Sequence, residues 1–268
     1  MNVLPKIMIG NHKVSRLIVG GNPFSGNSHQ SDHLSKEMRD YYTAEKIKQT
    51  LKECESCGIN TIQARGDVHI MRMLNEYWNE GGKIQWIAQT ASELTSITNN
   101  ARQIASYGAI ACYHHGSKTD SLYREGKIDS VKDVISAIKG TGMPAGLGTH
   151  DPEVIRYAED NYFDVDFYMM SFYNLSKRGE VYLPEDRESA CRVIQDVNKP
   201  FLAFKIMAAG RNDPEEAFRY AYGNIKSRDA VVIGIFTKNH PDQVKENVRL
   251  AKSSIAFFTK FKCQVFTS

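Results

Sequence analysis

Lys205 has the surroundings that point most directly to chemistry. It lies in the segment 201–209, where apolar residues flank it on both sides. An amine that loses part of its hydration binds its proton less tightly, so such a lysine can act as a base, as a Schiff-base nucleophile or as a fixed cation for an anionic substrate. The alternative is an amine that extends along the apolar surface into water. We predict a catalytic role for Lys205.

Three histidines that follow two successive apolar segments add groups that can transfer protons near neutral pH. His114 and His115 follow the apolar segment 109–113, and His150 follows the segment 145–149. Because side chains alternate along a strand, one of the two adjacent histidines should face inward and the other outward. A lone histidine is more often a hydrogen-bonded structural residue. We expect His114 to lie inside, and we predict catalytic roles for His114 and His150.

Amide and guanidinium groups follow other short apolar segments of the chain. Glutamine side chains offer donors and acceptors for hydroxyl groups, and a cationic lining suits a carboxylate, a phosphate or an enolate-like intermediate. We therefore predict a small polar or anionic molecule as the partner. The predicted substrate-binding residues are Asn22, Gln63, Arg65, Gln89 and His115.

These polar residues stand at the ends of short apolar segments that are rich in β-branched residues, a pattern typical of buried strands. The predicted strands are 17–19, 61–64, 85–88, 109–112, 145–147, 167–170, 201–204 and 231–233. Segments of helical period alternate with them, at 44–57, 68–79, 94–107, 130–139, 152–160, 187–196, 214–225 and 241–252. This alternation predicts an α/β fold with one (β/α)₈ barrel domain over residues 1–268, in which the loops after the strands build the active site. The long stretch 22–42 is a candidate substrate lid.

Composition narrows the classes of function. The 34 basic and 31 acidic residues give a net charge of +3, which argues against a nucleic-acid surface. No apolar run reaches the roughly 18–20 residues that span a bilayer, and the first residues lack the features of a signal peptide, so we expect a cytoplasmic protein that does not bind a membrane. Five scattered cysteines fit reduced thiols. Histidine and aspartate at positions 67, 69, 114 and 150 are zinc-ligand types, but their spacing is no specific signature, so we predict no metal.

Four segments resemble the aldo-keto reductases and occur in that family's order. Residues 6–15 resemble the hairpin that closes the bottom of the family's barrel, 14–21 its first strand, and 58–62 its entry to the second strand. The last match is 232–238 followed by 240–248. The resemblance implies the same barrel and an NADP cofactor. The residues that it implies for the nucleotide are Gly234, Ile235, Phe236, Thr237, Lys238, Gln243 and Asn247, to which we add Ser171 at the end of a predicted strand.

The catalytic residues of that family are largely replaced here. Its reductases use a tyrosine proton donor assisted by an aspartate, a lysine and a histidine; by position these fall near Val68 and at Gln63, Gln89 and His114. Only the histidine is kept, and glutamine cannot tune a proton donor as a charged residue does. A reductase would therefore need a relocated donor, for which Tyr173, Tyr41 and Tyr42 are the candidates.

Three functions remain open from the sequence. The first is an NADP-linked oxidoreductase acting on a small polar or anionic carbonyl compound, with Tyr173 as the favoured catalytic donor. The second is a cofactor-independent lyase or isomerase that uses Lys205 with His114 or His150. The third is a small-molecule binding protein without activity. The sequence identifies no substrate, and it leaves a homo-oligomer open.

Overall fold

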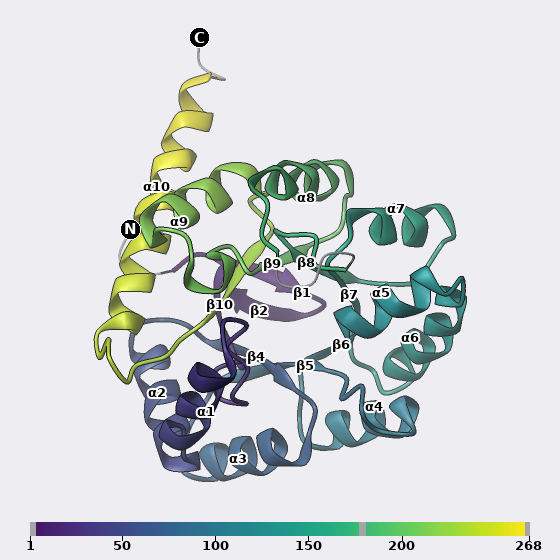
Figure 1. Cartoon of the computed structure of the whole chain (residues 1–268), viewed down its shortest axis with the longest axis horizontal. Helices are drawn as coiled ribbons and strands as arrows, with labels where there is room; N and C mark the ends of the chain where they lie inside the picture. Colours follow the sequence, from purple (N-terminus) through teal and green to yellow (C-terminus); the bar gives the residue numbers. More distant parts are fainter. Residues whose placement is uncertain (1–3, 177–180, 266–268) are drawn as a thin grey trace.

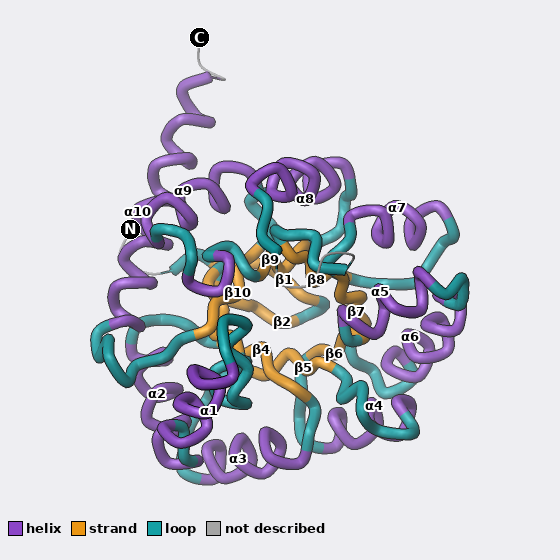
Figure 2. Tube along the Cα trace, in the orientation of Figure 1, coloured by secondary structure: helices purple, strands orange, loops and turns teal. Residues whose placement is uncertain are grey.

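The computed structural model describes residues 4–176 and 181–265, with the side chains described up to residue 259. Within this part of the chain, eight parallel strands close a barrel in the order β10-β3-β4-β5-β6-β7-β8-β9 (Figure 1, Figure 2). The predicted barrel is thus confirmed. Its strands are β3 (Leu17–Gly20), β4 (Thr61–Arg65), β5 (Gln85–Gln89), β6 (Ala111–His114), β7 (Ala145–Thr149), β8 (Phe167–Ser171), β9 (Phe201–Phe204) and β10 (Ala230–Gly234).

A hairpin of two antiparallel strands, β1 (Lys6–Ile9) and β2 (His12–Ser15), crosses one end of the barrel, as the resemblance implied. Gly10 makes its turn with a φ of +55°, in the left-handed region that favours glycine. Ile7, Ile9 and Val14 of the hairpin belong to the same buried cluster as the inward-facing side chains of the strands. The hairpin therefore closes this end, which leaves the opposite end, where the strands terminate, for a site.

Helices surround the barrel in a ring (Figure 2). They are α1 (Asp32–Tyr41), α2 (Ala44–Ser56), α3 (Val68–Asn79), α4 (Ile97–Ser106), α5 (Gly116–Arg124), α6 (Val131–Lys139), α7 (Pro152–Asp160), α8 (Pro184–Asp196), α9 (Pro214–Asn224) and α10 (Gln243–Val265), with short 3₁₀ turns η1 (Ile128–Ser130) and η2 (Ala208–Gly210). Two helices were not predicted. Helix α1 lies inside the stretch expected as a lid, and the polar sequence of α5 hides its helical period. None of the described helices is long and apolar enough to cross a membrane.

The strand register sets which side chains share one level of the barrel. Arg65 of β4 pairs with Gln89 of β5, and Gln89 pairs with Tyr113 of β6. Tyr113 is buried and its ring meets that of Phe167 edge-on inside the barrel, with centroids 6.5 Å apart. Because strand side chains alternate, an inward Tyr113 requires that His114 point outward.

Candidate functional site

A pocket of about 170 Å³, here called the mouth pocket, lies where the barrel strands end. It brings together seven residues that the sequence predicted for the site, from six strands or the loops that follow them. These are Asn22, Gln63, Arg65, Gln89, His115, His150 and Lys205. Its other lining residues are Asn27, His29, Tyr113, Gly116, Ser117, Gly148, Met169 and Phe204.

His150 is held by a buried carboxylate that sequence reasoning missed. Its Nδ1 lies 2.8 Å from Oδ2 of Asp120, which is 2% exposed and comes from α5. Asp120 also accepts hydrogen bonds from the Thr149 hydroxyl, at 2.5 Å, and from the His150 backbone N–H. When Nδ1 carries the ring proton and donates a hydrogen bond to this carboxylate, Nε2 is unprotonated and can accept a proton. The arrangement therefore prepares His150 as a base.

The two adjacent histidines take the reverse of the expected orientations. His114 lies outside the barrel wall at 2% exposure, with Nδ1 2.8 Å from the Thr119 hydroxyl, and burial lowers its pKa to about 4. His115 instead lines the mouth pocket. The expectation of an inward His114 was wrong because it followed the resemblance, whereas the packing of Tyr113 fixes the alternation.

His115 offers the pocket a neutral hydrogen-bond donor. Burial, together with the positive charge of Arg65 and the neighbouring His150, lowers the His115 pKa to about 4, so the ring is uncharged at neutral pH. Its Nδ1 accepts a hydrogen bond from the Lys118 N–H, at 3.3 Å, where it caps α5. The proton of the neutral ring therefore resides on Nε2. His115 is a donor where His150 is an acceptor.

Lys205 reaches the mouth through an unusual backbone. Directly after β9, it has a φ of +59°, a left-handed conformation that costs a non-glycine residue roughly 1–3 kcal/mol. Its Nζ lies 5.8 Å from the centre of the Tyr182 ring, a cation–π arrangement. Left-handed residues of this kind cluster at functional sites, where the surrounding fold holds them in place. Lys205 lines both the mouth pocket and the cavity beside it.

Arg65 supplies a second cation whose charge is partly matched. It forms ion pairs with Glu93 and with Asp67, the latter with Nε and Oδ2 3.3 Å apart. Burial opposes the charged form of Arg65, but these two carboxylates outweigh it and raise the pKa of the guanidinium. The pairs hold the group at the edge of the pocket, in the level of the barrel that it shares with Gln89.

A larger cavity of about 570 Å³, here called the side cavity, adjoins the mouth pocket. The two share Asn22, Asn27, His29, Gln63, Phe204 and Lys205. From there it extends between the loops after β9 and β10 and the first turns of α10. Of the residues predicted for a nucleotide, it is lined by Gly234, Phe236, Gln243 and Asn247.

The other residues predicted for a nucleotide do not line the side cavity. Lys238 Nζ lies 2.5 Å from the Glu37 carboxylate of α1. The Thr237 hydroxyl lies 3.0 Å from the phenol of Tyr41, and the Ile235 carbonyl accepts from the phenol of Tyr42. These contacts attach α1 to the loop after β10, in the stretch expected as a lid.

Two residues at the end of β8 also have structural partners instead of a place in either cavity. The buried Ser171 hydroxyl donates to the Tyr173 carbonyl at 2.7 Å. Tyr173 is 2% exposed, and its phenol accepts from Asn212 Nδ2 at 2.5 Å. Neither Tyr173 nor the alternative donors Tyr41 and Tyr42 lines the mouth pocket.

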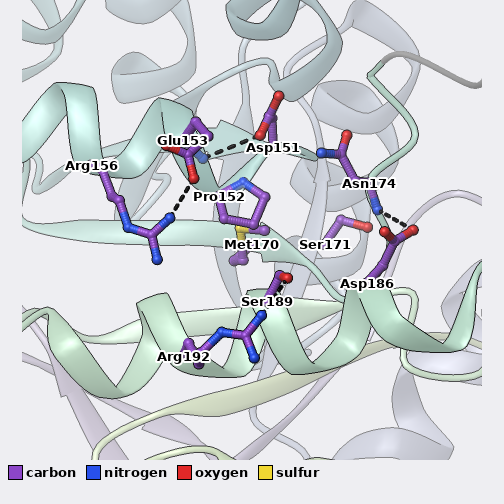
Figure 3. A pocket seen from close by; sticks show the side chains of 10 residues that line it. All are labelled: Asp151, Pro152, Glu153, Arg156, Met170, Ser171, Asn174, Asp186, Ser189 and Arg192. Atoms are coloured by element: carbon purple, nitrogen blue, oxygen red, sulfur yellow. Dashed lines mark hydrogen bonds and ion pairs between the residues drawn. The ribbon is translucent and has the colours of Figure 1, made fainter.

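A third cavity, of about 330 Å³, lies between α7 and α8, outside the barrel (Figure 3). Its polar groups satisfy one another: Arg156 pairs with Glu153, and the Arg192 guanidinium donates to the Ser189 hydroxyl at 2.8 Å. Its residues include Ser171 but none of those that line the mouth pocket. Among the residues that the structure describes, no group of three or more metal-ligating side chains is close enough together to hold a metal ion.

In comparisons with known proteins, no family model and no curated protein matches the sequence. Solved structures do match. A presumed aldo-keto reductase from Pseudomonas aeruginosa superposes with a TM-score of 0.65 at 16% identity, covering 95% of this chain and 98% of its own. An N-acetylmannosamine-6-phosphate 2-epimerase from Clostridium perfringens gives 0.58 at 14% identity, covering 86% and 92%. A truncated 3-deoxy-D-arabino-heptulosonate 7-phosphate synthase from Thermotoga maritima gives 0.56 at 12%, covering 98% and 94%. At these identities the chain shares with them the (β/α)₈ barrel fold.

Proposed function

We propose that this protein is an enzyme that transfers a proton at the carbon next to a carbonyl group of a small anionic compound, as cofactor-independent lyases and isomerases do. The observation that carries the proposal is the pair of histidines with opposite roles in the mouth pocket. His150, oriented by Asp120, accepts a proton through Nε2. Neutral His115 donates an N–H to the oxygen on which charge develops.

Positive charge in the same pocket suits the rest of such a substrate. The Lys205 ammonium and the Arg65 guanidinium line the pocket with His115 and His150. A fixed cation lowers the energy of an enolate more than that of the neutral carbonyl, so it favours the transition state of proton removal. Gln63 adds amide groups that fit a hydroxyl or carboxylate oxygen.

Reduction by NADPH, the first of the functions that the resemblance suggested, has less support from this geometry. The three tyrosines named as replacement donors lie away from the mouth pocket. Gln63 and Gln89 occupy the mouth where the resemblance places an aspartate and a lysine. Tyr113 lines the pocket, but burial raises its pKa well above the ordinary value, which makes it a weak acid. Binding of NADPH stays a prediction, tested by a fluorescence titration.

The test is exchange of hydrogen for deuterium at the methyl group of pyruvate, followed by proton NMR in D₂O. The wild type should catalyse this exchange without a nucleotide, and His150→Gln should lower the rate about 10²- to 10⁴-fold, the usual contribution of a general base. His33→Gln, at an exposed position on α1, is the matched control. Pyruvate binding without exchange would indicate a binding protein and refute the proposal.

A further inference from the structure

The side cavity has a lining unlike that of the mouth pocket. Its walls carry apolar side chains from four parts of the chain, including Leu34 and Met38 of α1, Met207, Val232 and Leu250. Among its described lining residues, Lys205 is the only lysine or arginine, and Lys205 stands at the boundary with the mouth pocket. Lys238, the other cation near the loop after β10, is paired with Glu37 and does not line the cavity. Glu246 of α10 also lines the cavity, and its carboxylate disfavours an anionic group there, so the far part of the cavity suits an uncharged group.

Asn247 gives independent evidence that this cavity receives a ligand. The residue is 4% exposed, it lines the cavity, and its Nδ2 has no hydrogen-bond partner among the described residues. A buried donor without a partner costs about 1–3 kcal/mol in measured cases, so folded proteins rarely keep one. Gln243, one turn earlier, is already engaged, because its Oε1 accepts from the Phe236 N–H at 2.6 Å. The amide of Asn247 is therefore available to an acceptor atom on a ligand.

We propose that the side cavity binds the apolar tail of an elongated carbonyl acid whose reacting head lies beside Lys205. This inference rests on the proposed function and names its substrate class: a 2-oxo acid or a similar anionic carbonyl compound, with a largely apolar chain that carries a hydrogen-bond acceptor. The cavity volume of about 570 Å³ lies within the range of small-molecule sites. Phe204 and Lys205 line both cavities, so one molecule can place its head in the mouth pocket and its tail in the side cavity.

The test is calorimetric titration with a series of 2-oxo acids from pyruvate to 2-oxooctanoate. Each added methylene that enters the apolar cavity should tighten binding about three- to fourfold. Leu34→Trp, which fills the cavity from α1, should abolish this gain and leave the dissociation constant of pyruvate within about twofold of wild type, because Leu34 does not line the mouth pocket. Met8→Trp, on an exposed residue of the hairpin at the closed end, is the matched control.

Three results would overturn the inference. The first is a constant affinity along the series, and the second is an equal loss for short and long acids in Leu34→Trp. The third is tight binding of NADPH that Leu34→Trp blocks while the affinity for 2-oxooctanoate stays unchanged, which would assign the cavity to a nucleotide. If no acid of the series binds at concentrations up to millimolar, affinity likewise does not depend on chain length, and the inference is overturned. Chain-length dependence without deuterium exchange would instead refute the proposed function and leave the binding site standing.

Discussion

Asp120→Asn tests whether the carboxylate beneath His150 sets the role of that ring. Asp120 accepts three hydrogen bonds at 2.5–3.2 Å, from the Thr149 hydroxyl, the His150 backbone and His150 Nδ1. An asparagine keeps the size of the side chain, but its amide can also donate. It then stabilises the His150 tautomer with the proton on Nε2, which is the wrong form for a base.

The expected cost follows from this geometry. A hydrogen bond to a charged group contributes about 1.5–3 kcal/mol, and loss of the correct tautomer removes most of a general base's 10²- to 10⁴-fold effect. We expect the exchange rate to fall about 10³-fold, within those limits. The Michaelis constant should stay within about twofold, because Asp120 does not line the mouth pocket and uniform substrate binding is kept.

Two measurements separate this role from a merely structural one. Nitrogen-15 correlation spectra of the imidazole should show the proton on Nδ1 of His150 in the wild type and on Nε2 in Asp120→Asn. Kinetics of the two proteins should differ in kcat. An unchanged kcat, or a loss of kcat without a change of tautomer, would show that Asp120 does not set the tautomer of His150 for catalysis.

Three further predictions concern the strained, unsatisfied and buried groups. Lys205→Gly should raise the free energy of unfolding by about 1 kcal/mol, because glycine adopts a φ near +59° without strain. The same substitution should abolish deuterium exchange, because it removes the ammonium group. Urea unfolding measures the first effect and NMR the second, and a destabilised variant would contradict the strain at Lys205. Asn247→Leu should raise the melting temperature in calorimetry, since it removes a buried donor without a partner; an unchanged or lower value would count against that reading. Burial lowers the pKa of His114 from 6.5 to about 4, so between these pH values only the unfolded state takes up the proton. The free energy of unfolding should therefore fall as the pH is lowered from about 6.5 to 4, by up to roughly 3 kcal/mol. Urea unfolding at several pH values should show this dependence weakened in His114→Leu.

The sequence predicted the barrel because each strand carries its own signal. Short runs such as Ala145–Thr149 and Ala230–Gly234 are apolar and bounded by polar or turn residues. The first of them is followed by a helix that begins with a capping aspartate and a proline. The lysine at the end of β9 and the glutamines of β4 and β5 were placed in the mouth by the same logic. That part of the site follows from strand ends alone.

The rest of the site depends on contacts that a linear pattern does not contain. Asp120 lies 30 residues before His150 on a polar helix, so only the packing of α5 against β7 brings them together. The inward face of β6 was assigned wrongly because the resemblance was preferred to the alternation set by Tyr113. The left-handed backbone of Lys205 and the contact of α1 with the loop after β10 likewise arise from tertiary structure.

Proton transfer in the mouth pocket should need no nicotinamide. Deuterium exchange into 2-oxooctanoate is measured with protein whose freedom from bound nicotinamide has been checked by fluorescence. The measurement is then repeated with saturating NADPH. We expect exchange without nucleotide, at a rate that NADPH leaves unchanged. Absence of exchange in the nucleotide-free protein, with oxidation of NADPH when both compounds are present, would contradict this expectation and establish a reductase.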